Sequence, residues 1–408
     1  MIDEAALEIL PAPYFETLWE QVHHPHFATH VLHLERTAYT QFQCTQCGDC
    51  CRSGWKIHLS KAYYDQWFEV FDNHPSGRFR APFTPYVHGQ TEERYAEMRR
   101  TADQACIFLE PDQSCFIHGH YGEEALSHVC RTYPRGHKSI QNFFSTRVLL
   151  HSCEAVPPLL ADHRELLYGW LEHDTREQFN AQNFVLTDHL TPAHNFLWLG
   201  LCFDVLRSAY PTAVFQRWRY LLQQLQGILP QDVSQSQARH WRWLNNQLQA
   251  QMPLVFVNPP APEQVSRALD WMCRVIPHPA CVAWLQSLEA LPPLTSASCQ
   301  VLNQHLQNYL EDRLLAVCYG DLFWGAANFW EQNLMLLLSA VAVQTLARYY
   351  AHHDNDALHI HHLERASIHW TKVVEQRNHL LQDFRVQGIS SATATTAMET
   401  LLALTPLQ

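Results

Sequence analysis

Four cysteines lie within eight residues near the start of the chain: Cys44, Cys47, Cys50 and Cys51, in the run FQCTQCGDCCRSGW. Thiols at Cys-x-x-Cys spacing can bind one metal ion because a tight turn brings both sulfur atoms to the same side. Doubling this spacing and ending it in an adjacent pair offers four soft ligands within one loop. The segment therefore predicts either a metal or iron–sulfur site or a group of disulfides.

The composition favours the metal or cluster site. Thirteen cysteines in 408 residues are too few for a small disulfide scaffold, and the chain is long enough to bury a core without cross-links. The first residues, MIDEAALEILPAPYF, lack the basic and then apolar pattern of a signal peptide, and the longest apolar run, 334–343, is too short to span a bilayer. We therefore expect a cytoplasmic protein without membrane association, in which paired thiols hold metal.

The first 155 residues contain further cysteines that can join the quartet: Cys106, Cys115, Cys130 and Cys153. Zinc takes four ligands, and iron–sulfur clusters are usually held by four thiolates, so eight candidates exceed the demand of one site. Two centres, or one centre with additional packed thiols, both remain open. Adjacent residues of an extended chain point to opposite sides, so we expect Cys50 and Cys51 to have different roles. The cysteines beyond residue 154 show no ligand spacing and are expected to pack as small core residues: Cys202, Cys273, Cys281, Cys299 and Cys318.

Charge and missing motifs exclude several classes of function. The formal net charge of −12 argues against a general nucleic-acid binder and fits small ligands or protein substrates that present lysine. The sequence contains no Gly-x-Gly-x-x-Gly after a strand, no phosphate-binding loop, no Gly-x-Ser-x-Gly and no His-Glu-x-x-His. Rossmann-type dinucleotide or methyl-donor sites, serine hydrolases and zinc proteases are therefore poor interpretations.

The fold class that we predict is mainly α, with a cysteine-rich and loop-rich module at residues 1–156 and a helical domain at residues 157–408. Within the module, Ser60 is the predicted N-cap of a helix over 60–71, and a polar helix is predicted over 91–102. Short strands are predicted over 105–110, 114–118 and 142–150. Apolar residues at spacings of three and four predict the helices of the second domain, over 159–174, 195–210, 214–229, 264–276, 281–291, 301–317 and 327–353, with a last helix or frayed tail after Gly388.

The cysteine motifs resemble those of two known protein families. The quartet, followed by CIFLEPDQSCFIH and CRTYPR, resembles the iron- or zinc-chelating domain family defined by that cysteine pattern. More closely, the chain resembles the flagellin lysine-N-methylase family, which places such a module in a longer helical chain. The supporting segments are FQC at 42–44, GWKI at 54–57, ALSHVCRTYPR at 125–135 and LHSCEA at 150–155, although the proline of the family's Ser-Cys-Pro-Glu-Ala segment is absent here.

The resemblance implies an iron–sulfur protein that uses S-adenosylmethionine to methylate lysine side chains of a protein, flagellin or another. A [4Fe–4S] cluster held among the eight cysteines named above is the expected cofactor, with zinc as the alternative. The alternative function is a non-catalytic metal or redox protein whose helical domain is a docking scaffold.

The expected methyl donor is a sulfonium cation that carries a carboxylate, so its site needs an anion anchor and an aromatic wall. Arg131 and Arg135 flank Cys130 and are candidates for the anchor, whereas Trp55 and Tyr133 are candidates for the wall. Each also has a structural interpretation, such as packing beside the metal loop for Trp55. The lysine must lose a proton before it attacks, and the sequence identifies no catalytic base for that step.

Overall fold

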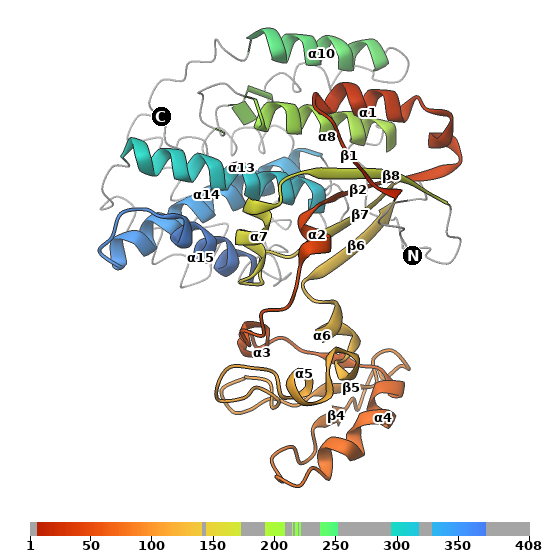
Figure 1. Cartoon of the computed structure of the whole chain (residues 1–408), viewed down its shortest axis with the longest axis vertical. Coiled ribbons are helices and arrows are strands. Elements are labelled where there is room, and N and C mark those ends of the chain that lie inside the picture. Colours follow the sequence, from red (N-terminus) through yellow and green to blue (C-terminus); the bar gives the residue numbers. More distant parts are fainter. Residues whose placement is uncertain are drawn as a thin grey trace. The chain divides into compact units, whose positions relative to one another are not determined.

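The computed structural model describes residues 6–140, 144–172, 192–208, 214, 217–218, 220–221, 237–251, 295–317 and 329–372 (Figure 1). The chain divides into two compact units. The helical unit comprises residues 1–40, 137–148 and 157–408, and the cysteine unit comprises residues 41–136 and 149–156. Residue 156 thus ends the cysteine unit, whereas the first 40 residues belong with the helices.

A five-stranded sheet in the order β1-β8-β2-β7-β6 belongs largely to the helical unit. Its strands are β1 (Glu8–Ile9), β2 (His30–Arg36), β6 (Arg135–Ile140), β7 (Phe144–Leu149) and β8 (Leu166–Glu172). The central strand β2 runs antiparallel to β8 and parallel to β7. Leu32 and Leu34 alternate along β2 with His33 and Glu35, and all four are buried, so both faces of this strand are covered.

Long helices supply most of the core of this unit. They are α1 (Tyr14–Val22), α8 (Pro192–Leu206), α10 (Gln237–Gln251), α13 (Ser296–Val317), α14 (Phe329–His353) and α15 (Ile360–Trp370), with the short α2 (Ala38–Gln41), α7 (Val156–Asp162) and the 3-10 turn η2 (Pro25–Ala28). Helix α8 is apolar around its circumference, as expected for a helix surrounded by others. Gly200 lets α1 approach closely, because a Cβ there would lie 2.7 Å from the Cα of Phe15. None of the described helices combines the length and apolar composition needed to cross a membrane.

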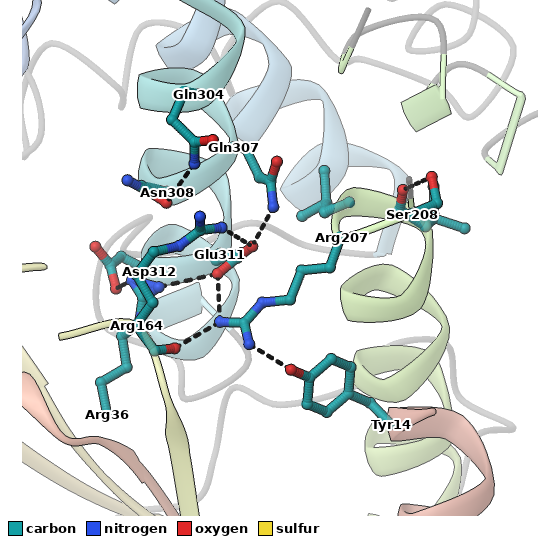
Figure 2. Close-up of polar contacts among 12 residues, drawn as sticks. Tyr14, Arg36, Arg164, Arg207, Ser208, Gln304, Gln307, Asn308, Glu311 and Asp312 are labelled. Carbon is teal, nitrogen blue, oxygen red and sulfur yellow. Dashed lines mark hydrogen bonds and ion pairs between the residues drawn. The ribbon is translucent and has the colours of Figure 1, made fainter. Parts of the chain in front are cut away.

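A buried ion cluster connects the sheet to these helices (Figure 2). The carboxylate of Glu311, on α13, lies 2.9 Å from the guanidinium of Arg36, 2.7 Å from that of Arg207 and 3.6 Å from that of Arg164. Arg36 also binds Asp312 at 2.7 Å. Burial alone raises the pKa of Glu311, but the charges of Arg207 and Arg36 outweigh it and lower the pKa overall. The residue therefore stays ionised as the shared counterion of three arginines.

The cysteine unit has a small sheet in the order β3-β5-β4, formed by β3 (His58–Leu59), β5 (Ala96–Met98) and β4 (Phe83–Pro85). Its helices are α3 (Asp49–Arg52), α4 (Lys61–Asp72), α5 (Phe116–Tyr121) and α6 (His128–Thr132), with a 3-10 turn η3 (Glu123–Ala125). The core is mainly aromatic, since Phe71, Phe79, Phe83 and Phe108 are at most 2% exposed and contact one another. Loops therefore make up much of this unit around a compact aromatic centre.

Several predicted elements are confirmed. Helix α4 begins after Ser60, whose Oγ accepts the backbone N–H of Tyr63 at 3.3 Å, and Trp67 stacks on Phe71 along its buried stripe. Strand β7 and the predicted helices over 195–210, 301–317 and 327–353 correspond to elements of the structure. The described part is mainly helical, as expected. Cys202 and Cys299 are buried. The remaining predictions lie outside the described residues: the helices over 264–276, 281–291 and most of 214–229, the tail after Gly388, and Cys273, Cys281 and Cys318.

Two predicted helices are wrong, and cross-strand pairing explains both. A local cap does form at the start of the segment predicted over 91–102, because Oγ1 of Thr91 accepts the N–H of Arg94 at 3.0 Å, but the chain then turns into β5 between β3 and β4. The segment 159–174 contains α7 and then β8, which pairs along its whole length with β2. The hairpin predicted over 105–118 is reduced to the Leu109–Cys115 bridge, after which Phe116 begins α5. Apolar spacing alone did not separate buried strands from helices.

The Glu311→Gln substitution tests the ion cluster. It leaves the buried guanidinium of Arg36 and the partly buried ones of Arg207 and Arg164 without their shared charge, so we expect the free energy of unfolding to fall by about 3–5 kcal/mol. Glu16→Gln is the matched control, because Glu16 pairs with Arg242 at the surface, where such pairs contribute up to about 1 kcal/mol. Chemical denaturation of both variants measures the difference, and equal losses would contradict the role assigned to Glu311.

Candidate metal centre

The cysteine quartet folds as a turn followed by one helical turn. Gly48 adopts the left-handed conformation with φ of +68°, and its carbonyl accepts the N–H of Cys51 at 3.0 Å. Cys50 and Cys51 therefore lie on α3, whereas Cys44 and Cys47 precede it. A Cβ at Gly48 would lie 2.1 Å from the backbone oxygen of Gln113, so only glycine lets this loop approach the 106–115 segment.

Cys51 lies at the centre of one set of thiols. Its side chain forms hydrogen bonds with the thiols of Cys106, Cys115 and Cys50. Its carbonyl accepts the backbone N–H of Cys106 at 2.8 Å, which fixes the α3 turn against the later segment. Cys115 enters the set because the Leu109–Cys115 bridge folds the intervening turn back. Cys130, on α6, is near the same thiols and has its N–H bonded to Ser127 Oγ at 3.3 Å.

The remaining thiols, Cys44, Cys47 and Cys153, gather near Cys50. Cys153 is close to Cys47, Cys50 and Cys44, and burial raises the pKa of its thiol to about 12. The pKa of Cys44 is also raised, first by burial and further by the neighbouring thiols of Cys50 and Cys47. Cys50 thus lies near Cys44 and Cys153 as well as near Cys51 and Cys115. All eight cysteines are free thiols, so the structure brings the predicted residues together without disulfides.

The thiols differ in how readily they give up a proton. The S–H of Cys51 donates toward Cys115, and the N–H groups of His118 and Ile117 at the start of α5 add to this, which lowers the pKa of Cys115 to about 7. The pKa of Cys50 is also lowered, mainly by its hydrogen bond with Cys51. Burial instead raises the pKa of Cys130 to about 12. Because metals bind thiolates, Cys115 and Cys50 are the thiols best prepared to receive one.

A pocket of about 60 Å³ opens beside these thiols. Four cysteines border it: Cys50, Cys51, Cys106 and Cys130. Trp55 and Tyr133 form one wall, with ring centroids 5.0 Å apart in an edge-to-face arrangement, and the Tyr133 hydroxyl bonds to Ser152 Oγ at 2.9 Å. Arg99 and Arg100 also line the pocket, and Nη2 of Arg100 is buried without a hydrogen-bond partner. The site thus presents thiols, aromatic rings and an unsatisfied cationic donor together.

The predicted donor-site residues divide into two pairs. Trp55 and Tyr133 line the pocket, but Arg131 and Arg135 do not. Arg131 pairs with Glu124 at 3.2 Å on the surface, and Arg135 donates to the carbonyl of Phe42 at 2.8 Å and lies over its ring. Sequence reasoning missed Arg100, whose place depends on a bridge that pairs it with Cys106. No local motif marks that pairing.

The sequence is similar to three curated bacterial proteins. It is 27% identical over 133 residues to the flagellar biosynthetic protein FliU of Salmonella muenchen, a match that covers 32% of this chain and 78% of that protein. It is 28% identical over 173 residues to the lysine-N-methylases of Salmonella typhimurium and Salmonella choleraesuis, covering 42% of this chain and 41% of each methylase. The matched region therefore spans less than half the length of the methylases. No family model and no solved structure matches the chain.

The Gly48→Ala substitution tests the close approach of the quartet loop. The added Cβ meets the Gln113 carbonyl, so we expect the cysteine unit to lose stability and bound metal. Gly77→Ala is the matched control, because Gly77 has a similar φ of +65° and nothing within 4 Å of its Cβ position. The free energy of unfolding of the control should fall only by about 1–2 kcal/mol, which is the cost of alanine in a left-handed backbone conformation. Thermal unfolding and metal analysis compare the two, and equal effects would contradict the steric role of Gly48.

The rate of Cys115 alkylation should follow its lowered pKa. In reduced, metal-free protein, the thiolate becomes the major form above about pH 7, so reaction with iodoacetamide should rise between about pH 6 and 8 and then level off. Cys130 should react slowly throughout this range, because its thiol is buried with a pKa of about 12. Peptide mapping by mass spectrometry measures both rates. A Cys115 rate that still increased tenfold per pH unit above pH 8 would contradict the assignment.

Proposed function

We propose that the chain is a protein-lysine N-methyltransferase that depends on an iron–sulfur cluster and uses S-adenosylmethionine. The observation that carries the proposal is the pocket, which places Trp55, Tyr133 and Arg100 next to four thiols. The similarity to two lysine-N-methylases supports a methyltransferase-like function. The similarity to FliU, which is named a flagellar biosynthetic protein, supports a protein as the substrate, flagellin or another.

The donor set fits the proposed cluster. Eight thiols lie together without disulfides, and Cys50 and Cys115 have lowered pKa values, so thiolate ligands can form near neutral pH. The thiolates that would hold it come from among Cys44, Cys47, Cys50, Cys51, Cys106, Cys115, Cys130 and Cys153. The bound cluster would supply an electron-transfer centre next to the pocket. Zinc remains the alternative metal, since it also binds thiolates.

The pocket fits one end of the methyl donor. A volume of about 60 Å³ holds roughly four water molecules, which is the scale of a sulfonium and amino-acid group rather than of the whole molecule. Trp55 and Tyr133 would face the sulfonium cation, an interaction worth about 0.5–2 kcal/mol. Nη2 of Arg100 lacks a hydrogen-bond partner and would bind the donor carboxylate.

The reaction moves a methyl group from the sulfonium sulfur to the lysine Nζ, with loss of one proton and release of S-adenosylhomocysteine. The lysine must be neutral to attack, and exclusion of water by the aromatic wall favours that form. The net charge of −12 gives the protein a field that attracts lysine-bearing surfaces. We assign no residue as the base.

A second candidate is a metal or redox centre without catalysis. Cys106 and Cys115 pack against the aromatic core of the cysteine unit, so a bound metal would also stabilise the fold. In this interpretation the helical unit is a docking scaffold, and the pocket carries no donor.

The test uses anaerobically purified protein with iron, sulfide and zinc analysis, an absorption spectrum, and labelled S-adenosylmethionine incubated with cell extract. We expect iron and sulfide, donor binding and a labelled protein band. Arg100→Ala should weaken donor binding at least tenfold because the carboxylate loses its partner, whereas Arg131→Ala, which removes a surface arginine outside the pocket, should leave it unchanged.

Absence of both donor binding and a labelled band would overturn the methyltransferase proposal. If Cys51→Ser then lost metal and fold together, the second candidate would stand. Colourless protein loaded with zinc would replace the cluster by zinc.

A further inference from the structure

A histidine-rich segment connects α14 to α15 in the helical unit. Residues 352–362 read HHDNDALHIHH, with five histidines and two aspartates in eleven positions. The segment contains no cysteine and belongs to the unit that lacks the quartet. The proposed methyltransferase chemistry assigns it no role.

Backbone bonds hold the segment in a defined loop. The N–H groups of Asp354 and Asp356 bond to the carbonyls of Tyr350 and Ala351 at 2.8 and 2.9 Å, and so close the end of α14. Asn355 adopts a left-handed φ of +52°, which reverses the chain. Oδ1 of Asp356 then accepts the N–H of Ala357 at 2.7 Å, so the orientation of this carboxylate is fixed.

Three side chains converge where this loop meets α15. One ligand atom each from Asp356, His361 and His362 lies within 4.8 Å of the others. The rings of His361 and His362 have centroids 3.8 Å apart, and His359 adds a third imidazole, with Nε2 3.5 Å from Oδ1 of Asp356. Arg365 pairs with Asp354 at 3.1 Å, and so neutralises the neighbouring carboxylate rather than Asp356.

His362 provides an independent indication of a binding site, because it has a buried ring nitrogen without a hydrogen-bond partner. Its side chain is 0% exposed, and its Nε2 has no hydrogen bond, with only the Asp354 carboxylate at 3.7 Å. A buried polar nitrogen without a partner is destabilising, so the site gains when that nitrogen is coordinated. Exposed His361 and Asp356 leave the opposite side accessible to an incoming ion.

We propose that Asp356, His361 and His362 form a binding site for a divalent first-row transition metal, zinc being the best match. Two imidazoles and a carboxylate are ligands that zinc takes at such sites, with water or His359 in the fourth position. The bound ion would tie the loop after α14 to the first turn of α15.

Metal binding also rearranges the start of α15. Nδ1 of His362 accepts the N–H of His359 at 3.1 Å, which places the ring proton on Nε2. Coordination through Nε2 moves that proton to Nδ1 and ends this bond. Metal coordination outweighs the loss of this single cap bond.

The test titrates zinc into full-length protein whose cysteine centre is already filled, by calorimetry. We expect the wild type to bind one more equivalent than His361→Ala, and Asp356→Asn to weaken this binding at least tenfold. Asp356→Asn keeps an oxygen that accepts the Ala357 N–H, and His361 is exposed, so both variants should fold. His353→Ala is the control, since it removes an exposed histidine of the same segment outside the triad.

A cobalt titration adds a second readout, because ligands without sulfur give no thiolate charge-transfer band. The proposal fails if His361→Ala binds zinc like the wild type, if His353→Ala weakens binding equally, or if the cobalt bound at the additional site shows thiolate bands. Far-UV circular dichroism of each variant without added zinc confirms that a loss of binding is not a loss of fold.

Discussion

The cysteine unit depends on contact between two backbone segments that are about sixty residues apart in sequence. The Cys51 carbonyl binds the Cys106 N–H, and Gly48 lies against the Gln113 carbonyl. These contacts involve no sulfur, yet they decide which sulfurs meet. Because closing a long loop costs entropy, the backbone bonds and the aromatic core must hold the segments in place before thiols at distant positions can act as one donor set.

The same contacts set the acid–base character of the thiols. Hydrogen bonding with Cys51 lowers the pKa of Cys50 and of Cys115, so these are the thiols that ionise first. Burial keeps Cys130 and Cys153 protonated, with pKa values of about 12. A metal that arrives at the ionised thiols supplies the charge that lets the buried thiols lose their protons in turn. We therefore expect binding of the proposed metal to begin at Cys50 and Cys115.

The sequence predicted the elements whose signals are local. The Ser60 cap and the long apolar periods of α13 and α14 need no distant partner, and they appear as expected. The helix predicted over 91–102 failed because the pairing of β5 with β3 and β4 outweighs a local cap at Thr91. The pocket shows the same limit: Trp55 and Tyr133 follow from their nearness to cysteines, whereas Arg100 depends on a bridge to Cys106.

The two units meet the cost of buried polar groups in different ways. In the helical unit an extensive apolar core surrounds Glu311, and three arginines satisfy it within the protein. The cysteine unit has a core of eleven described residues, which is small for a unit that also holds eight free thiols and a buried guanidinium nitrogen of Arg100 without a partner. Small cores are commonly completed by a metal, and binding energy then becomes folding energy. A centre at these cysteines would thus support both the pocket and the fold that forms it, which is why the chemistry and the stability of this unit must be measured together.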